Sequence, residues 1–234
     1  MRFDRKTVMV TGAAGNLGRA VAQGFADRGA RLVLVDLDRA RLESAFGADA
    51  EDQMLAPTNL LDRGQVAAAV QAAAARFGGI DVLCHLAGGF RMGEAVHETS
   101  DATWDFLLDL NARTLLNVAH AVVPVMLAAG GGRIVTVGAG AGQKGVGQMG
   151  AYCAAKASVL RLTEAMSAEL REQGVNVNCV LPSIIDTPEN RQAMPDADPA
   201  KWVAPAALAD AIAFLASDAA RAVHGVALPV TGLS

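Results

Sequence analysis

The chain has 234 residues, of which 52% are hydrophobic and 19% are charged, and its formal net charge is −4. It is long enough for one domain with a substantial core, and its composition is that of an ordinary soluble globular protein. The slightly acidic balance excludes a basic nucleic-acid-binding surface. No metal site is predicted, because the cysteines and three of the histidines lack the spacing of metal ligands. These residues are Cys84, Cys153, Cys179, His97, His120 and His224.

The start of the chain and its longest apolar tract give no sign of export or membrane insertion. The opening residues MRFDRK are charged and lead directly into an apolar run, so a secretory signal is not expected. The tract at residues 115–129 contains His120 and Pro124, and it is shorter than the ~20 residues that a membrane-spanning helix needs. We therefore expect a cytoplasmic protein with a small-molecule substrate and with neither nucleic acid nor a membrane as a partner.

Apolar runs alternate with helical stretches along the chain. Strands are predicted at residues 7–11, 31–35, 80–86, 133–137, 175–181 and 226–230. Helices are predicted after a glycine-rich turn up to residue 28 and at residues 64–76, 101–129, 152–172 and 206–217. Continuous apolar strands separated by helices indicate a parallel sheet that is covered on both faces. With right-handed crossovers, this predicts one α/β domain over residues 1–234, a doubly wound Rossmann fold with a mostly parallel, seven-stranded sheet.

The segment at residues 182–205 has no clear periodicity, and a loop of this length is typical of a lid over a functional site. We predict such a lid at about residues 183–205. Within it, Met194 and Trp202 either cover the substrate or close the core.

The first predicted strand ends in a glycine-rich turn that leads at once into a helix. Its sequence is TGAAGNLG, with glycines at Gly12, Gly15 and Gly18 and with Asn16 and Leu17 between the last two. Glycine permits a tight turn and a close approach of the backbone, and the helix N-terminus offers free N–H groups to phosphate oxygens. Between a strand and a helix, this turn predicts a dinucleotide site, and a purely structural turn is the alternative.

Asp36 ends the second predicted strand, 18 residues after Gly18. A carboxylate there accepts hydrogen bonds from the adenosine ribose and repels a 2′-phosphate, so NAD(H) is the preferred cofactor and NADP(H) is less favoured. The nearby Arg39 and Arg41 weaken this preference. The alternative role of Asp36 is to cap the helix that begins near Asp38.

Tyr152 and Lys156 are one helical turn apart, so their side chains can face the same cleft. A tyrosine in water titrates near pH ~10, and a nearby ammonium group stabilises the phenolate and lowers this pKa. The pair therefore predicts Tyr152 as a proton donor, with Lys156 lowering its pKa and holding the nicotinamide ribose.

The chain resembles the short-chain dehydrogenase/reductase family over nearly its full length. The matching motifs are TGAAGNLGRA, VDLD, LAGG, LDLNARTLLN, GRIVTV, YCAAK, VNVNCVLP, DTP and FLASDAARAVHG. The resemblance implies a nicotinamide-dependent oxidoreductase in which Asn111, Tyr152 and Lys156 act in catalysis, Asn111 by anchoring a water relay. It also implies a cofactor site made of the turn, Asp36, Tyr152, Lys156 and a further set of residues. That set is Asn59, Leu60, Ala87, Gly88, Gly89, Pro182, Ile185 and Thr187, the last of which holds the nicotinamide carboxamide.

One residue of the family pattern is absent. Where the family places a catalytic serine ahead of the tyrosine, this chain has Ala139. The serine hydroxyl polarises the substrate carbonyl, and losing one such donor lowers the rate by about 10²–10³. Gln143 or Lys144, in the loop that follows, are candidates for a replacement donor. His85 is expected to pack rather than to catalyse.

Within the family, the resemblance is greatest to the quinoid dihydropteridine reductase branch. It lies in the serine-less stretch before Tyr152 and in residues 180–202, VLPSIIDTPENRQAMPDADPAKW. It implies a quinonoid, pterin-like substrate that accepts hydride readily, so that a carbonyl-polarising hydroxyl matters less.

The sequence therefore predicts an NAD(H)-dependent oxidoreductase that works through Tyr152 and Lys156 without serine. Its substrate is a small carbonyl or alcohol, or a quinonoid compound. The alternative is a non-catalytic, NAD-binding regulator or scaffold whose active site has decayed. The long helices at residues 101–129 and 152–172 resemble the family's subunit-packing pair, which implies a homodimer or homotetramer.

Overall fold

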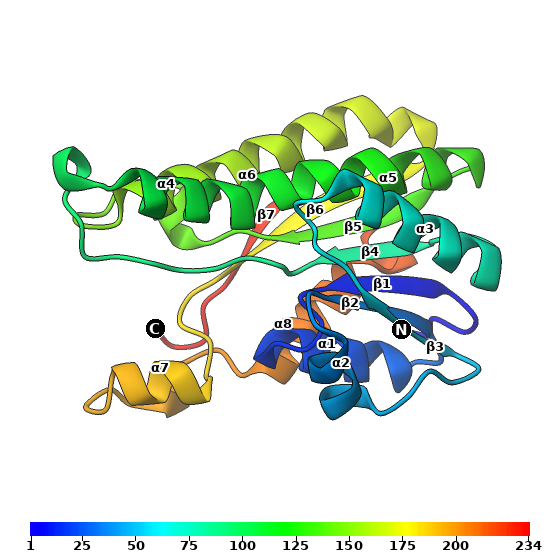
Figure 1. Cartoon of the computed structure of the whole chain (residues 1–234), viewed down its shortest axis with the longest axis horizontal. Coiled ribbons are helices and arrows are strands. Elements are labelled where there is room, and N and C mark those ends of the chain that lie inside the picture. The colour runs from blue at the N-terminus through cyan, green and yellow to red at the C-terminus, as the bar shows by residue number, and fades with distance from the viewer.

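Seven parallel strands form one sheet in the computed structural model, which describes residues 1–234 (Figure 1). Their order across the sheet is β3-β2-β1-β4-β5-β6-β7. The strands are β1 (Thr7–Thr11), β2 (Arg31–Asp36), β3 (Gln53–Pro57), β4 (Val82–His85), β5 (Gly132–Val137), β6 (Val175–Pro182) and β7 (Ala227–Val230). The strand order reverses between β1 and β4, and in such sheets ligands bind at the carboxyl ends of the strands beside this reversal.

Helices cover both faces of the sheet. The helices are α1 (Asn16–Ala26), α2 (Arg39–Phe46), α3 (Arg63–Phe77), α4 (Asp101–Leu108), α5 (Thr114–Ala128), α6 (Gly150–Leu170), α7 (Pro188–Ala193) and α8 (Pro205–Leu215). Figure 1 shows α3, α4, α5 and α6 on one face and α1, α2 and α8 on the other. The doubly wound α/β fold predicted from the sequence is therefore confirmed, and every strand pair is parallel.

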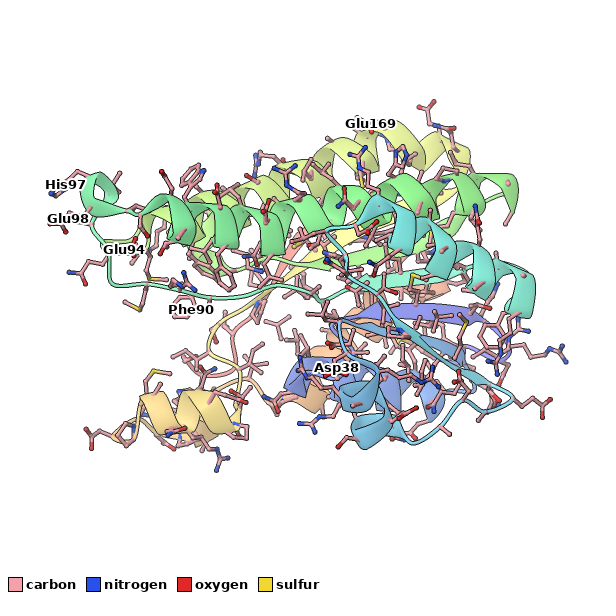
Figure 2. All side chains as sticks on the ribbon, viewed as in Figure 1. Asp38, Phe90, Glu94, His97, Glu98 and Glu169 are labelled. Atoms are coloured by element: carbon pink, nitrogen blue, oxygen red, sulfur yellow. The ribbon has the colours of Figure 1, made fainter.

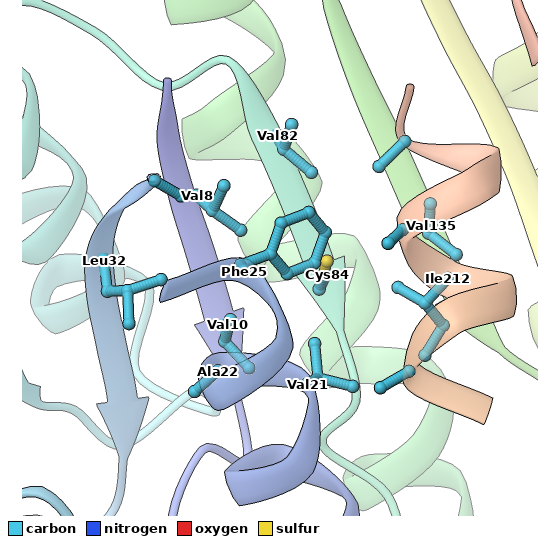
Figure 3. Close-up of a cluster of buried hydrophobic side chains, with 14 of the residues drawn as sticks. Val8, Val10, Val21, Ala22, Phe25, Leu32, Val82, Cys84, Val135 and Ile212 are labelled. Atoms are coloured by element: carbon cyan, nitrogen blue, oxygen red, sulfur yellow. The ribbon is translucent and has the colours of Figure 1, made fainter. Parts of the chain in front are cut away.

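Alternation along each strand builds a separate core on each face of the sheet. In β1, Val8 and Val10 face α1 and α8, where they pack with Phe25 and Ile212 (Figure 3). Met9 points to the opposite face and joins the apolar side chains beneath α3 and α5. Because both faces are buried, the strands read as continuous apolar runs, which is why most of them could be predicted.

The single long helix predicted at residues 101–129 is interrupted by a π turn. Residues Asp109–Arg113 form this turn between α4 and α5, and Asn111 lies at its centre. Such turns insert an extra residue into a helix and are frequent at functional sites. The whole run Asp101–Ala128 is 28 residues long and apolar enough to cross a membrane, but 44% of its most apolar window is buried within this fold. It covers the sheet.

Neither the strand β3 nor the helix α2 was predicted, because that region mixes charged and small residues without a clear period. The lid predicted at about residues 183–205 is partly regular. It contains α7 and a one-turn helix at Pro199–Lys201, and Ile185 pairs with Val203 in an isolated bridge.

Candidate active site

The turn between β1 and α1 leaves its backbone open at the carboxyl end of the sheet. Gly12 has φ +66°, and a Cβ there would lie 3.1 Å from the backbone nitrogen of Ala87. A Cβ on Gly18 would overlap the carbonyl oxygen of Gly12, so only glycine fits where α1 passes the turn. Gly15 precedes α1 and has no capping side chain, which leaves the first N–H groups of the helix available. These features fit the diphosphate of a dinucleotide.

Asp36 lies at the end of β2, beside this turn. Its carboxylate accepts hydrogen bonds from the N–H groups of Ala14 (3.0 Å) and Leu37 (2.9 Å). Arg41 Nη1 lies 3.5 Å from the same carboxylate, whose side chain is only 9% exposed. Helix α2 is capped by Asp38, whose carboxylate accepts a backbone N–H of that helix. The alternative role of Asp36 as this cap is therefore wrong.

The lid contacts the glycine-rich turn through one side-chain hydrogen bond. Asn16 Nδ2 donates to Glu189 Oε2 at 2.7 Å, and Asn16 Oδ1 accepts from Arg19. Thr187 caps α7, since its hydroxyl accepts the N–H of Asn190 at 3.2 Å. The lid is thus held next to the start of α1, where the glycine-rich turn ends. Sequence reasoning missed Glu189, which is far from Asn16 along the chain.

His85, at the end of β4, is buried between two threonine hydroxyl groups. Thr11 Oγ1 accepts hydrogen bonds from the N–H groups of Leu86 and Ala87 and lies 3.1 Å from His85 Nδ1. Both lone pairs of this oxygen are used, so its hydrogen points to Nδ1, and Nε2 directs the ring proton to Thr114 Oγ1 at 3.4 Å. Burial lowers the pKa of His85 to about 3, which keeps the ring neutral. His85 is therefore a packed, neutral side chain, and through Thr11 it helps to hold the residues that follow β4 in place.

Asn111 and Lys156 converge at Gly88. The Asn111 side-chain amide donates to the carbonyl of Gly89 (3.1 Å) and accepts its N–H (3.3 Å). Lys156 Nζ donates to the carbonyl oxygen of Val137 at 3.0 Å. A Cβ on Gly88 would lie 2.8 Å from Asn111 Oδ1 and 3.3 Å from Lys156 Nζ, so this glycine makes room for both side chains. Burial lowers the pKa of Lys156 to about 8.

Tyr152 lies in the first turn of α6. Lys156 Nζ is 5.9 Å from the centroid of its ring, so the two side chains do share one region. Burial raises the pKa of Tyr152 to about 12. Desolvation of the phenolate is the largest cause of this shift, and the lowering of the pKa by Lys156 stays a prediction. The phenol therefore keeps its proton at neutral pH, as a proton donor must.

Ala139 follows β5 and is buried, with 8% of its surface exposed. The candidate replacement donors Gln143 and Lys144 are exposed, and neither side chain makes a hydrogen bond that would fix it near Tyr152. Gln148, which sequence reasoning missed, lines a small recess together with Tyr152 and has φ +59°. A non-glycine residue in this conformation is strained, and such residues cluster at functional sites.

The remaining predicted cofactor residues lie on the loops at the same end of the sheet. Asn59 Oδ1 accepts the N–H of Leu61 at 3.0 Å, and Asn117 Nδ2 donates to the carbonyl of Leu60 at 2.9 Å. The loop after β3 is thereby tied to α5. Asn117 was missed, although an asparagine inside an apolar helix is a visible signal.

The lid residues divide between the core and the surface of the site. Pro182 ends β6, and Ile185 lies three residues further on. Trp202 is 7% exposed and closes the core, whereas Met194 is half-buried at the end of α7. The burial of Trp202 favours the packing role, and its covering of the substrate stays a prediction.

A separate hollow lies away from these residues. It has a volume of about 770 Å³ and lies at the amino-terminal edge of the sheet. Its lining includes the ion pairs Lys6–Asp81 (2.7 Å) and Arg133–Asp218 (3.4 Å). None of the predicted site residues line it, so it is not the site described above.

Similarity to known proteins identifies the family of this chain. The sequence pattern of the family described as short chain dehydrogenase matches residues 6–198. The chain belongs to this family. D-threitol dehydrogenase of Mycolicibacterium smegmatis is 35% identical over 99% of this chain and 93% of its own length. Cis-4-hydroxycyclohexanecarboxylate dehydrogenase of Sinomonas cyclohexanicum is 35% identical over 98% of this chain and 96% of its own.

A solved structure gives the same result. Carveol dehydrogenase from Mycobacterium avium in complex with NAD superposes with a TM-score of 0.89 at 27% identity, over 99% of this chain and 98% of that chain. This member of the short chain dehydrogenase family is therefore a nicotinamide-dependent oxidoreductase that acts on small alcohols or carbonyls. None of these three relatives is named a pteridine reductase, so the narrower resemblance stays a prediction.

Proposed function

We propose that this short chain dehydrogenase transfers hydride between NAD(H) and the carbonyl carbon of a small molecule, with Tyr152 as the proton donor. The observation that carries the proposal is the convergence of Tyr152, Lys156 and Asn111 at one end of the sheet, where Gly88, which has no side chain, makes room for Asn111 and Lys156. Bound NAD(H) supplies or accepts a hydride at its nicotinamide ring.

The residues of the chain divide the remaining work. The turn Gly12–Gly18 binds the diphosphate, Asp36 binds the adenosine ribose, and Thr187 holds the carboxamide. Lys156 has one proton in its bond to Val137 and two left for the nicotinamide ribose.

Asn111 has a narrower role than the sequence implies. Its amide donates one hydrogen to Gly89 and the other, at 2.9 Å, to the carbonyl of Leu107. Both donors are used, so only the oxygen can take part in a water relay. We therefore propose that Asn111 chiefly positions the segment after β4, and that any relay water binds as a donor.

The absence of a hydroxyl group at position 139 narrows the range of candidate substrates. A quinonoid, pterin-like ring accepts hydride without carbonyl polarisation, which supports that candidate. The names of the relatives support an alcohol or ketone instead, either an open-chain polyol or a hydroxylated ring. Reducing a quinonoid pterin and a panel of ketones with NADH distinguishes these substrates.

Ala139→Ser is expected to raise kcat/KM for simple ketones by about 10-fold or more, because it restores a donor to the carbonyl oxygen beside an otherwise complete site. Steady-state oxidation of NADH measures this change. Ala141→Ser, in the same loop, is the control and leaves kcat/KM unchanged. If Ala139→Ser brings no gain, another group already supplies the donor or the site does not bind ketones.

Asp36→Asn is expected to shift the ratio of kcat/KM for NADH over NADPH toward NADPH by about 10-fold or more, because the substitution removes a charge that repels a 2′-phosphate and frees Arg41. Initial rates with both cofactors measure the ratio. Asp38→Asn makes the same charge change two residues away and serves as the control. An unchanged ratio would show that Asp36 does not face the ribose.

NADH binding without turnover of any carbonyl or pterin would favour the alternative, a regulator or scaffold with a decayed site.

We also propose a homodimer or homotetramer. Trp104, Phe106 and Leu116 on α4 and α5 are 46%, 38% and 45% exposed, and exposed apolar side chains of this size favour contact with another subunit. A monomer in light scattering would contradict this assembly.

A further inference from the structure

Two charged side chains of the connection between β4 and α4 contact α4, and they line the same recess as Tyr152. The guanidinium group of Arg91 stacks on the ring of Phe106, 4.3 Å from its centroid, and contacts Thr103. The carboxylate of Glu94 accepts hydrogen bonds from the N–H of Ser100 (2.9 Å) and the hydroxyl of Thr103 (2.8 Å). The charged groups of this connection are therefore engaged by α4.

The apolar side chains of the same connection are left uncovered. Phe90 is 55% exposed and Met92 is 53% exposed. The ring of Phe90 packs edge-to-face on Tyr152, with centroids 4.8 Å apart and an angle of 90°. An exposed aromatic ring therefore lies directly against the proposed proton donor.

The connection is fixed on both sides of Phe90. Before it, Gly89 is held by Asn111, and after it, the N–H of Gly93 donates to the carbonyl of Gln148 at 2.9 Å. Glu94 also pairs with Met149 in an isolated bridge. Figure 2 shows Phe90 on this connection, which runs between α4 and the lid helix α7 in that view. Phe90 is thus presented by a fixed backbone rather than by a free loop.

We propose that Phe90 forms a substrate subsite that selects a carbonyl compound with an apolar ring over an open-chain polyhydroxy ketone. This inference rests on the proposed function. The substrate ring covers the exposed part of Phe90 and thereby brings its carbonyl oxygen to the phenol of Tyr152. In the reduction, hydride adds to the carbonyl carbon, the C=O π bond breaks, and the oxygen takes the phenol proton, while NADH is oxidised to NAD⁺.

The choice of a ring follows from the chemistry of this wall. A polyhydroxy substrate loses water from each hydroxyl on entry, and each then needs a hydrogen-bond partner in the site. Phe90 and Met92 offer a phenyl ring and a thioether instead, and the Arg91, Glu94 and Thr103 side chains that share the recess with Tyr152 are already hydrogen-bonded within the protein. An apolar ring loses little on leaving water and gains contact area on the phenyl face.

The test compares two ketones, cyclohexanone and erythrulose, in the wild type and in Phe90→Ala with NADH. We expect the wild type to prefer cyclohexanone in kcat/KM. Phe90→Ala should raise the KM for cyclohexanone by about 10-fold, because the exposed part of the phenyl ring, which the substrate ring would cover, is about half of the side chain. The KM for erythrulose and the KM for NADH should change less than about twofold.

Two further variants separate a ring subsite from a structural role. Phe90→Trp keeps an aromatic face and should retain most of the preference for cyclohexanone. Phe214→Ala removes an exposed aromatic ring from α8, on the other face of the sheet, and should change neither ketone's KM. Equal losses for both ketones in Phe90→Ala, or a wild type that prefers erythrulose, would overturn the proposal.

If neither ketone is reduced, the proposed function fails on these substrates, and binding decides the inference separately. Saturation-transfer NMR then measures contact between the NADH-loaded protein and the protons of each ketone. Ring signals that appear in the wild type and are lost in Phe90→Ala would support the subsite. Ring signals that are absent, or equal in both proteins, would overturn it.

Discussion

Tyr152→Phe is expected to lower kcat/KM by about 10²–10⁴-fold while the affinity for NADH stays the same, because the variant removes only the proton donor. The phenyl ring that packs against Phe90 is retained, so the variant should fold normally. Initial rates and a fluorescence titration with NADH measure the two quantities. Undiminished turnover would exclude Tyr152 as the donor.

The protonation state of this residue can be measured directly. Tyr152 is the only tyrosine in the chain, so tyrosinate absorbance reports on it alone. Burial raises its pKa to about 12, and little tyrosinate should therefore form below pH ~10, where a free tyrosine is half ionised. A tyrosinate signal near neutral pH would instead support the depressed pKa that the Tyr-Lys spacing suggested.

Gly18→Ala is expected to abolish NADH binding and to destabilise the fold by about 1–3 kcal/mol or more. The new methyl group would overlap the carbonyl oxygen of Gly12 and would lie 2.5 Å from that of Ala13. Both are backbone atoms, so the turn must open to relieve the contact. Thermal unfolding and an NADH titration measure the two effects.

Gly24→Ala is the matched control for this variant, because it lies in the same helix. Its nearest neighbours would be the flexible end of Arg28 at 3.2 Å and the side chain of Ala209 at 3.8 Å. Alanine also favours a helix interior over glycine by up to ~1 kcal/mol. Gly24→Ala should therefore keep NADH binding and stability, and equal losses in both variants would refute the account of the turn.

Elements buried on both faces could be predicted from the sequence, and of the two edge strands β7 was predicted while β3 was not. β1 and β6 are uniformly buried, and their apolar runs mark them clearly. β3 is an edge strand whose five residues, Gln53–Pro57, include only two buried ones, so no run or strict alternation appears. The lid helix α7 is short and polar, and its local signals are the cap at Thr187 and Pro188 at the first helical position.

The site shows a similar division. The glycine-rich turn, Asp36 and the Tyr152–Lys156 pair have fixed spacings along the chain, so their patterns could be read. The contact of Asn16 with Glu189 and that of Phe90 with Tyr152 join residues far apart in sequence, and only the fold brings them together. The sign of the Tyr152 pKa shift depends on how deeply the phenol is buried, which no spacing reveals.

The central claim is hydride transfer to a substrate carbon in a site that lacks a hydroxyl at position 139. The most direct measurement uses NADH that carries deuterium at the transferring position of C4, with mass spectrometry of the product from each ketone. We predict one deuterium atom on the former carbonyl carbon, and none when Tyr152→Phe replaces the wild type. Products without deuterium, or NADH that binds and is never oxidised by any ketone or quinonoid pterin, would contradict the account.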